Sequence, residues 1–244
     1  MERLGTLERL RRYPVKSMAG EDMQEARVTY AGLLGDRVYA FVDNGNRSSF
    51  PWMTGRQGPP MILFRPRFTA GWTSEEEHPR ADQYAVEVTT PEGEVYKVND
   101  PRFREYLEMR FGRSLTLRFS ERSMMDAMPV SVLGLGTLSG LGGELGMSLD
   151  GRRFRANFYV RWANDAPYYE DELVGRRLRI GEQVEVQVVE KDSRCKMITL
   201  DPETAEAAPR VLERVALKHG GCTGVYGAVL REGVVRVKDA VYAV

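Results

Sequence analysis

The sequence predicts a β-rich α+β protein with barrel-like sheets and a few helices. Short segments rich in β-branched and aromatic residues recur along the chain between turn residues, and helical periodicity is confined to a few places that do not alternate with them. No period of 20–50 residues repeats. With 244 residues, 42% of them apolar, the chain can build a core without disulfide or zinc cross-links.

Turn signals divide the first 120 residues into short expected strands. Residues 36–43 alternate β-branched and aromatic side chains, which predicts a strand. Residues 83–90 and 94–98 flank the turn at 91–93 and are typical of a hairpin. The polar segment 71–82 is expected to be a solvated loop.

Near residue 100 the hydrophobic period changes to that of a helix. Asp100 is a capping carboxylate, and Pro101 follows it at the first helical position. Phe103 and Leu107 then lie one turn apart on the same face, and Gly112 ends the helix.

Strand signals dominate the remainder of the chain, with two further helical segments. The glycine-rich residues 134–146 suggest a short irregular helix, and residues 209–219 form an amphipathic helix that two glycines end. We expect a hairpin around the turn at 231–233. The expected strands are 115–119, 130–133, 158–161, 177–180, 184–189, 225–231 and 234–237.

Charge and composition exclude several classes of partner. Thirty-five basic and 35 acidic residues give a net charge of zero, so no overall field attracts nucleic acid or an anionic membrane. The charged N-terminus resembles no secretory signal, and the longest uncharged stretch contains proline and glycines that make it unfit to span a bilayer. We therefore expect a cytoplasmic protein with free thiols.

Common cofactor motifs are missing from the sequence. A zinc site would have to combine Cys195, Cys222, His78 and His219, which show no ligand spacing. Residues 134–139 place a serine where the dinucleotide fingerprint needs its third glycine. Neither the P-loop nor the nucleophile-elbow motif is present.

What remains is an ordered series of basic and polar motifs beside strand signals. In chain order they are Tyr-Pro-Val-Lys-Ser (13–17), Gly-Asp-Arg (35–37), Arg-Phe-Arg-Ala-Asn (153–157), Glu-Asp-Glu (170–172), Gly-Arg-Arg-Leu-Arg-Ile-Gly (175–181), Ser-Arg-Cys (193–195) and Thr-Leu-Asp-Pro-Glu-Thr (199–204). Together they resemble the MOSC family, which takes its name from the C-terminal domain of molybdenum-cofactor sulfurases. The N-terminal motifs resemble the β-barrel domain that precedes MOSC in the mitochondrial amidoxime-reducing component and its bacterial relatives.

This resemblance implies two domains. Residues 1–120 would form an N-terminal MOSC-type β-barrel lobe, packed on a MOSC β-barrel domain at residues 121–244. The implied cofactor is the molybdenum cofactor in its pyranopterin (molybdopterin) form.

The resemblance also assigns site residues by position. Cys195 matches the cysteine whose thiolate binds molybdenum, a soft ligand for a metal already held by dithiolene sulfurs. Arg194 would favour the ionised thiol. Arginines suit bidentate contacts with the cofactor phosphate. The positions implied for cofactor binding are Lys16, Ser17, Arg37, Thr137, Arg155, Asn157 and Arg194. Gly134 departs from the family pattern, in which a serine is common.

Three functions are consistent with these motifs. In the first, the protein is an oxidoreductase that reduces N-hydroxylated or N-oxygenated small molecules, with Cys195 as the metal ligand. Its electrons would come from separate proteins, ferredoxin-like or cytochrome b5-like with a reductase, because no iron–sulfur cysteine cluster is present. In the second, Cys195 carries sulfur as a persulfide, or the protein delivers the cofactor. In the third, a barrel without cofactor binds another anion.

Overall fold

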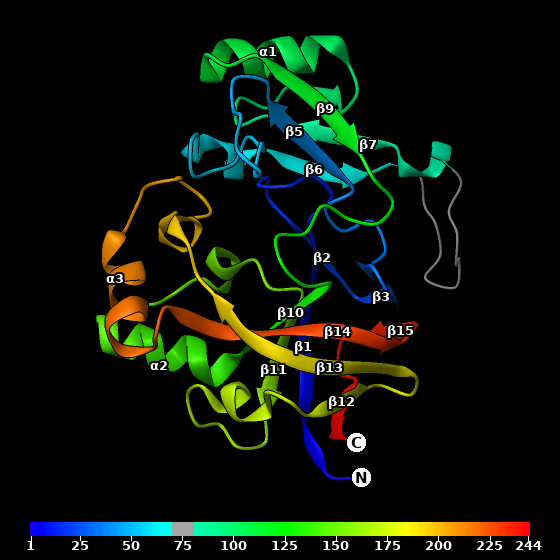
Figure 1. Ribbon diagram of the computed structural model, residues 1–244, viewed down its shortest axis with the longest axis vertical. Helices are drawn as coiled ribbons and strands as arrows, with labels where there is room; N and C mark the ends of the chain where they lie inside the picture. The colour runs from blue at the N-terminus through cyan, green and yellow to red at the C-terminus, as the bar shows by residue number, and fades with distance from the viewer. Residues whose placement is uncertain (70–80) are drawn as a thin grey trace.

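The chain folds into two lobes, one above the other in Figure 1. The computed structural model describes residues 1–69 and 81–244, so the loop expected at 71–82 lies outside the described residues except for its last two. Strands outnumber helices in both lobes, which confirms the β-rich α+β fold class. None of the helices in the described ranges is long and apolar enough to cross a membrane.

A closed barrel of seven strands forms the lower lobe. The strands follow the order β11-β10-β14-β13-β12-β16-β1, and β1 pairs back with β11 to close the cylinder. Closure leaves the barrel strands without a free edge. The barrel strands are β1 (Arg3–Arg12), β10 (Val130–Gly134), β11 (Phe158–Trp162), β12 (Arg177–Ile180), β13 (Val184–Ser193), β14 (Cys222–Arg231) and β16 (Ala240–Ala243).

Strand β1, which the sequence patterns did not predict, completes this barrel. Leu4, Leu7 and Leu10 are all buried although they lie three residues apart, a spacing that is not typical of a strand. The register with β11 shifts between Leu7 and Arg9, and this bulge turns the later residues so that Leu10 also faces the core. The first strand of the chain is therefore part of the same sheet as strands from residues 130–243.

The upper lobe is built from two small sheets and one helix around a second core. The helix α1 (Pro101–Phe111) begins and ends as predicted, with the Asp100 side chain accepting a hydrogen bond from the Arg102 N–H and Gly112 in the left-handed conformation. Phe103 and Leu107 face the buried side. The strands are β5 (Tyr39–Asp43) with β9 (Leu115–Phe119), and β6 (Arg65–Phe68) with β7 (Val86–Thr89) and β8 (Val95–Lys97). The expected hairpin is the β7–β8 pair.

The hairpin expected around residues 231–233 is wrong. Strand β15 (Gly233–Arg236) pairs with β3 (Glu25–Thr29), which also pairs with β4 (Gly32–Leu33). Strand β14 pairs with β13 and β10 instead, and β15 extends the small sheet of β3 and β4. The short strand β2 (Glu21–Met23) adds to β1.

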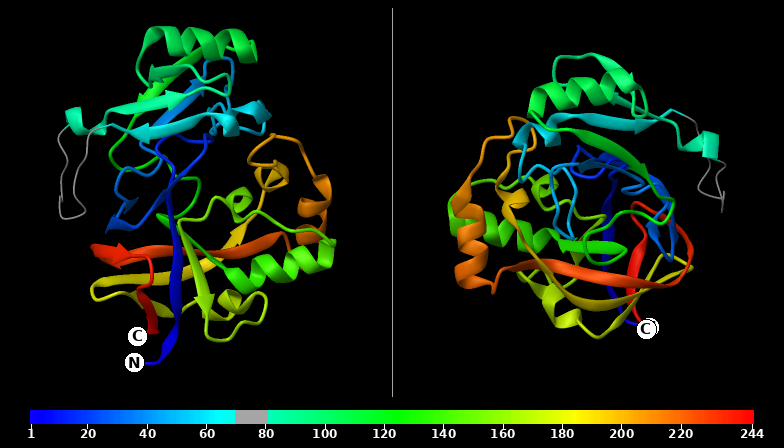
Figure 2. Two further views of the ribbon diagram at one scale, coloured as in Figure 1. Left: turned by 180° about the vertical axis from the view of Figure 1, so that it is seen from behind. Right: turned by 45° about the horizontal axis from the view of Figure 1, so that its top comes forward.

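Two helices pack beside the barrel on the same side (Figure 2). The glycine-rich segment forms a regular helix α2 (Leu135–Leu145) rather than the irregular one expected, and α3 (Pro209–Lys218) agrees with its prediction. They share a third apolar cluster with the barrel strands. Single 3₁₀ turns fill the connections: η1 (Pro59–Leu63), η2 (Ala81–Tyr84), η3 (Gly151–Phe154), η4 (Tyr169–Leu173) and η5 (Lys196–Thr199).

A buried carboxylate holds the start of α2. Glu170 is completely buried and accepts hydrogen bonds from the Gly134 N–H at 3.0 Å and the Thr137 hydroxyl at 2.9 Å. The Thr137 oxygen accepts in turn from the Tyr168 N–H at 2.8 Å. Burial raises the pKa of Glu170. The Glu170 carboxylate thus takes the place of a capping side chain at the start of the helix, because the N-cap residue is a glycine.

Gly134 is a packing requirement of this arrangement. A Cβ atom at this position would press against the Glu170 carboxylate and would lie 2.9 Å from Trp162 Nε1. We predict that Gly134→Ser, which introduces the residue common in the family that the motifs resemble, lowers the free energy of unfolding by about 1–3 kcal/mol through overpacking. Urea unfolding followed by circular dichroism measures this change.

Gly143 in the same helix provides the control. Nothing lies within 4 Å of a Cβ added at Gly143, so Gly143→Ser should leave stability unchanged or raise it by about 0.5 kcal/mol through helix propensity. Equal stability of the two variants would show that Gly134 is not constrained by Glu170.

Candidate functional site

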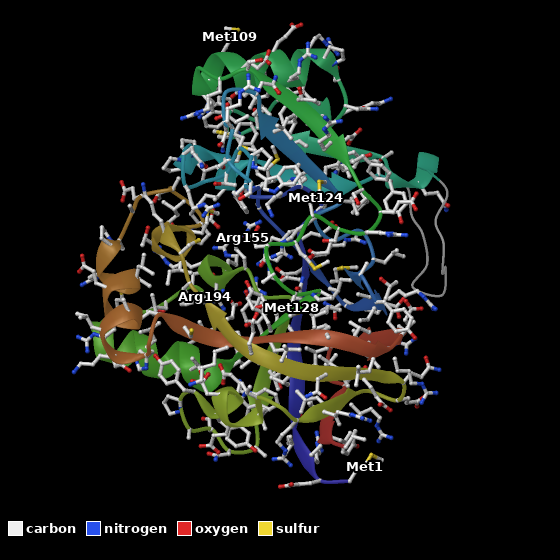
Figure 3. The ribbon with its side chains drawn as sticks, viewed as in Figure 1. Met1, Met109, Met124, Met128, Arg155 and Arg194 are labelled. Atoms are coloured by element: carbon white, nitrogen blue, oxygen red, sulfur yellow. The ribbon has the colours of Figure 1, made fainter. Side chains whose placement is uncertain are left out.

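A cavity of about 300 Å³ lies at the seam between the two lobes. Its wall combines the segment after β1, the turn before β5, η3 and the end of β13. Figure 3 shows Arg155 and Arg194 in the middle of the molecule, between the upper lobe and the barrel. The structure brings together six of the residues expected at the site: Lys16, Ser17, Arg37, Arg155, Arg194 and Cys195.

Cys195 presents an accessible thiol in this wall. It lies two residues after the end of β13, in extended conformation, and precedes the 3₁₀ turn η5. Its side chain is exposed, whereas Cys222 is half-buried at the start of β14, with its Sγ 3.7 Å from the Gly220 carbonyl oxygen. Of the two free cysteines, Cys195 is the one that lines the cavity.

Lys16 is held by the loop that joins the two lobes. Its side chain is 5% exposed, forms an ion pair with Asp126 and donates to the Met124 carbonyl oxygen at 2.6 Å. Burial lowers the pKa of Lys16. Burial alone would raise the pKa of Asp126, but Lys16 and the cations near it lower it. Lys16 therefore stays beside the cavity as half of an ion pair.

Arg37 is fixed against the buried ring of Tyr13. Its guanidinium lies 4.8 Å from the centre of that ring, pairs with Asp36 and donates to the Arg155 carbonyl oxygen at 3.1 Å. Asp36 also accepts a hydrogen bond from the Tyr13 N–H at 2.7 Å. This network connects the upper lobe to η3 of the barrel lobe.

Arg155 is the least compensated cation in the cavity wall. Its Nη1 donates to the Met18 carbonyl oxygen at 2.7 Å, but its buried Nη2 has no hydrogen-bond partner, and no carboxylate in residues 1–69 or 81–244 forms an ion pair with it. Burial, together with the charges of Arg37 and Arg11, lowers the pKa of Arg155 to about 10. A ligand with negative charge would remove this imbalance.

Backbone strain is concentrated at the same residues. Ser17, Arg37 and Arg155 adopt φ values of 65°, 51° and 55°, the left-handed region that disfavours residues with a Cβ atom. The described chain has only four other such residues outside glycine, and none of them lines the cavity. Strain held in one place in this way is typical of ligand sites.

Arg194, by contrast, is used within the protein. All three of its guanidinium nitrogens already bond to neighbours: Nε to the Thr223 carbonyl oxygen at 2.7 Å, Nη1 to that of Phe154 at 2.8 Å, and Nη2 to Thr223 and Asp192. Its side chain is 6% exposed. Arg194 therefore ties β13 to β14 and to η3 beneath the cavity.

Two expected site residues do not reach the cavity. Thr137 is completely buried in the Glu170 cluster at the start of α2. Asn157 is 1% exposed, and its amide bridges β1 to β10, donating to the Arg11 carbonyl oxygen at 3.2 Å and accepting from the Ser131 N–H at 3.2 Å. Both side chains satisfy backbone and side-chain partners inside the barrel lobe, so the structure gives them supporting positions.

The cavity also contains residues that the motifs did not identify. Arg56 lines it, with its guanidinium 4.3 Å from the Phe50 ring centre and no ion-pair partner among the described residues. Both lie in a loop without a recognisable signature. Asp192 directly precedes the Ser-Arg-Cys motif (193–195), and this position in the sequence could have identified it as a cavity residue.

Asp192 forms a buried polar cluster at the wall of the cavity. Its Oδ2 accepts from the Ser131 hydroxyl at 2.7 Å and lies 2.8 Å from Arg194 Nη2, and the Tyr226 hydroxyl hydrogen-bonds to the same carboxylate. Burial raises the pKa of Asp192, which Arg194 and these hydrogen bonds oppose. Burial and Asp192 together raise the pKa of Tyr226.

A bare metal ion has no ready-made site here. Within the described ranges, no group of three or more histidine, cysteine, aspartate or glutamate side chains converges on one point. His78, one of the four residues considered for zinc, lies outside the described residues. The arrangement of one thiol with several cations suits a metal that brings most of its own ligands within an anionic cofactor.

A known crystal structure shares the overall fold, and two others align with lower scores. The crystal structure of YuaD from Bacillus subtilis aligns over 98% of this chain and 94% of its own, with 15% sequence identity and a TM-score of 0.51. YiiM from Escherichia coli aligns over 96% of this chain and 69% of its own, with 12% identity and a TM-score of 0.42. YiiM from Geobacillus stearothermophilus covers 48% of this chain and 54% of its own, with 18% identity and a TM-score of 0.38. No curated protein matches the chain.

Family signatures cover both lobes. The model of the MOSC N-terminal beta barrel domain matches residues 4–105, and that of the MOSC domain matches residues 120–242. The first match includes β1, although this strand closes the barrel formed by residues of the second. The division at residues 120 and 121 stays a prediction. Since the MOSC match alone spans half of the sequence and agrees with the motifs around the cavity, the chain belongs to the MOSC domain family.

Proposed function

We propose that this protein binds the molybdenum cofactor in the seam cavity and reduces N-hydroxylated or N-oxygenated small molecules, with Cys195 as the protein ligand to molybdenum. The observation that carries the proposal is the exposed Cys195 thiol in a cavity whose cations come from both lobes. MOSC domains are associated with this cofactor in general, which supports the assignment.

The charges of the wall suit an anionic cofactor. Six basic side chains line the cavity against two carboxylates, and Arg155 and Arg56 have no ion pair within the described part of the chain. The buried, unbonded Nη2 of Arg155 offers a donor that the protein itself leaves unused. A phosphate accepts well from such guanidinium groups, so the residues present fit a pyranopterin phosphate.

Each residue has a definite part in holding such a group. Arg155 and Arg37 would bind the phosphate, with Lys16 and Ser17 as further donors from the upper lobe. Cys195 would supply a thiolate, the soft ligand that molybdenum takes beside sulfur. The cofactor would supply the two-electron redox chemistry, while the protein determines orientation and access.

The chemistry of N-reduction also requires protons. Conversion of R–NHOH to R–NH₂ and water consumes two electrons and two protons. Asp192 and Tyr226 place a carboxyl group and a hydroxyl group in the cavity wall, and burial raises the pKa of both, so they are the groups that would hold or pass protons there. The electrons would come from separate proteins, since the two cysteines cannot hold an iron–sulfur cluster.

The ligand role of Cys195 has a direct test. Protein made in a host that synthesises the cofactor should contain near-stoichiometric molybdenum by elemental analysis and should reduce benzamidoxime when given an electron donor. Cys195→Ala should abolish the reduction and leave the circular dichroism spectrum unchanged. Cys222→Ala, the matched control, should keep its activity because this thiol lies outside the cavity wall.

Other outcomes would identify a different role. Full turnover by Cys195→Ala would exclude the thiolate ligand. Release of thiocyanate by cyanide from the unmodified protein, without N-reduction, would identify Cys195 as a sulfur carrier. Absence of both activities, with no bound molybdenum, would indicate a barrel that binds another anion.

The strained backbone at Arg155 gives a second test. Arg155→Ala and Arg155→Gly both remove the guanidinium, and we expect both to lower molybdenum content at least tenfold, the loss of one charge-assisted contact. Glycine tolerates a φ of 55°, so the glycine variant should be about 1 kcal/mol more stable than the alanine variant in urea unfolding.

Lys238 is the control for this comparison. It has a φ of 79° but does not line the cavity. Lys238→Gly should therefore be more stable than Lys238→Ala by a similar amount. Both variants should keep the molybdenum content of the wild type. If Arg155→Gly retained wild-type molybdenum content, Arg155 would have no part in cofactor binding.

A further inference from the structure

A second cavity, of about 260 Å³, lies in the same seam. It is lined by β1, β2, β6 and the turns η3 and η5, and it contains neither Cys195 nor Arg37. Tyr13 stands in its wall, and Arg153, Arg155 and Met197 line both cavities. The two cavities are thus neighbours with a common partition.

The wall of the second cavity is strongly basic. Six arginines line it against one carboxylate, that of Glu21, which is itself paired with Arg12. Four of these arginines have carboxylate partners nearby: Arg65 and Arg152 with Glu203, Arg67 with Glu87, and Arg153 with Asp201. The two that remain are Arg11 and Arg155.

Arg11 is buried without adequate partners. Its side chain is 5% exposed, and its Nη2 donates to the Gly20 carbonyl oxygen at 2.6 Å. Its Nε and Nη1 have no hydrogen-bond partner. The nearest carboxylate, Asp22, lies 3.6 Å from Nη1 and is already held by Arg9 through two hydrogen bonds of 2.6 and 2.9 Å. Burying unbonded charged donors in this way is costly unless a ligand accepts from them.

Arg155 has no carboxylate partner within the described ranges, and its Nη2 is also unbonded. Arg11 shares its one carboxylate, Asp22, with Arg9, so both guanidinium groups keep unbonded donors that match a dianion with several acceptor oxygens. Apolar residues also line the cavity, among them Ile62, Pro66, Leu200 and Pro202. Such a site would hold the charged head of a ligand and shelter a small apolar body.

We propose that this second cavity is a binding site for a small phosphate monoester, held by Arg11 and Arg155 and separate from the cavity of Cys195. The site does not depend on molybdenum, because its residues are complete without the cofactor. Arg155 is shared, so a dianion in the second cavity lowers the positive charge available to an anion in the first.

Isothermal titration of the purified full chain with phenyl phosphate tests the site. We expect Arg11→Met to weaken binding at least tenfold. Arg3→Met removes a charge at the start of the same strand, outside the cavity and away from Asp22, and should bind within twofold of the wild type. Arg37→Met should also retain binding at this site, because Arg37 lines only the first cavity.

A second variant covers the case in which Arg11→Met fails to fold. Pro202→Glu adds a carboxylate to the cavity lining without touching Arg11, and we expect it to weaken phenyl phosphate binding at least tenfold. Wild-type binding by a folded Arg11→Met or by Pro202→Glu would overturn the proposal, as would loss of all binding in Arg37→Met, which would place the anion in the first cavity. Molybdenum content in these proteins reports on the proposed function independently.

Discussion

The seam between the lobes depends on positive charge gathered around one buried aromatic ring. Tyr13 is 1% exposed, and the guanidinium groups of Arg155, Arg37 and Arg11 lie 4.4, 4.8 and 5.8 Å from its ring centre. Each cation–π contact is worth about 0.5–2 kcal/mol, which offsets part of the repulsion between like charges. The ring lets three cations share one small volume with Asp36 as the nearby carboxylate.

The seam combines two features that lower the stability of the protein, strained backbone and uncompensated charge. The same short segments that hold the cations contain left-handed residues, at Ser17, Arg37 and Arg155. Their backbone is fixed by hydrogen bonds between neighbouring segments, such as Lys16 N–H to the Tyr39 carbonyl oxygen at 2.8 Å and Arg37 N–H to that of Tyr13 at 2.6 Å. Backbone strain and uncompensated charge therefore occur together, and an anionic ligand would relieve the second of these.

Local signals explain what could be predicted from the sequence. The cap of α1 at Asp100 and the apolar face of α3 are determined by neighbouring residues, so their boundaries were correct. Strand β1 contains a bulge that forms only through pairing with β11, far away in the sequence. Its leucines therefore do not follow the alternation by which a strand is predicted from local sequence. The residues near the cavity could be identified because they lie in motifs that match those of the MOSC family.

The motifs could not show which of their residues offer free donors to the cavity and which only support its wall. Thr137, Asn157 and Arg194 belong to the same patterns as Arg37 and Arg155, but their hydrogen bonds are satisfied within the protein. Arg11 shows the opposite case, since it lies in a charged N-terminal segment that looks like an ordinary solvated surface. Burial and unsatisfied donors become visible only once the barrel has closed around it.

The shared partition makes the two cavities dependent on each other. Arg155 lines both, so a ligand that draws its guanidinium toward one cavity removes a donor from the other. Thermodynamic linkage requires the effect to be reciprocal: an anion in the second cavity would weaken binding in the first by the same factor as the reverse. Because Tyr13 and η3 hold the backbone around Arg155, this coupling needs no movement of the lobes and acts through the Arg155 side chain and its charge.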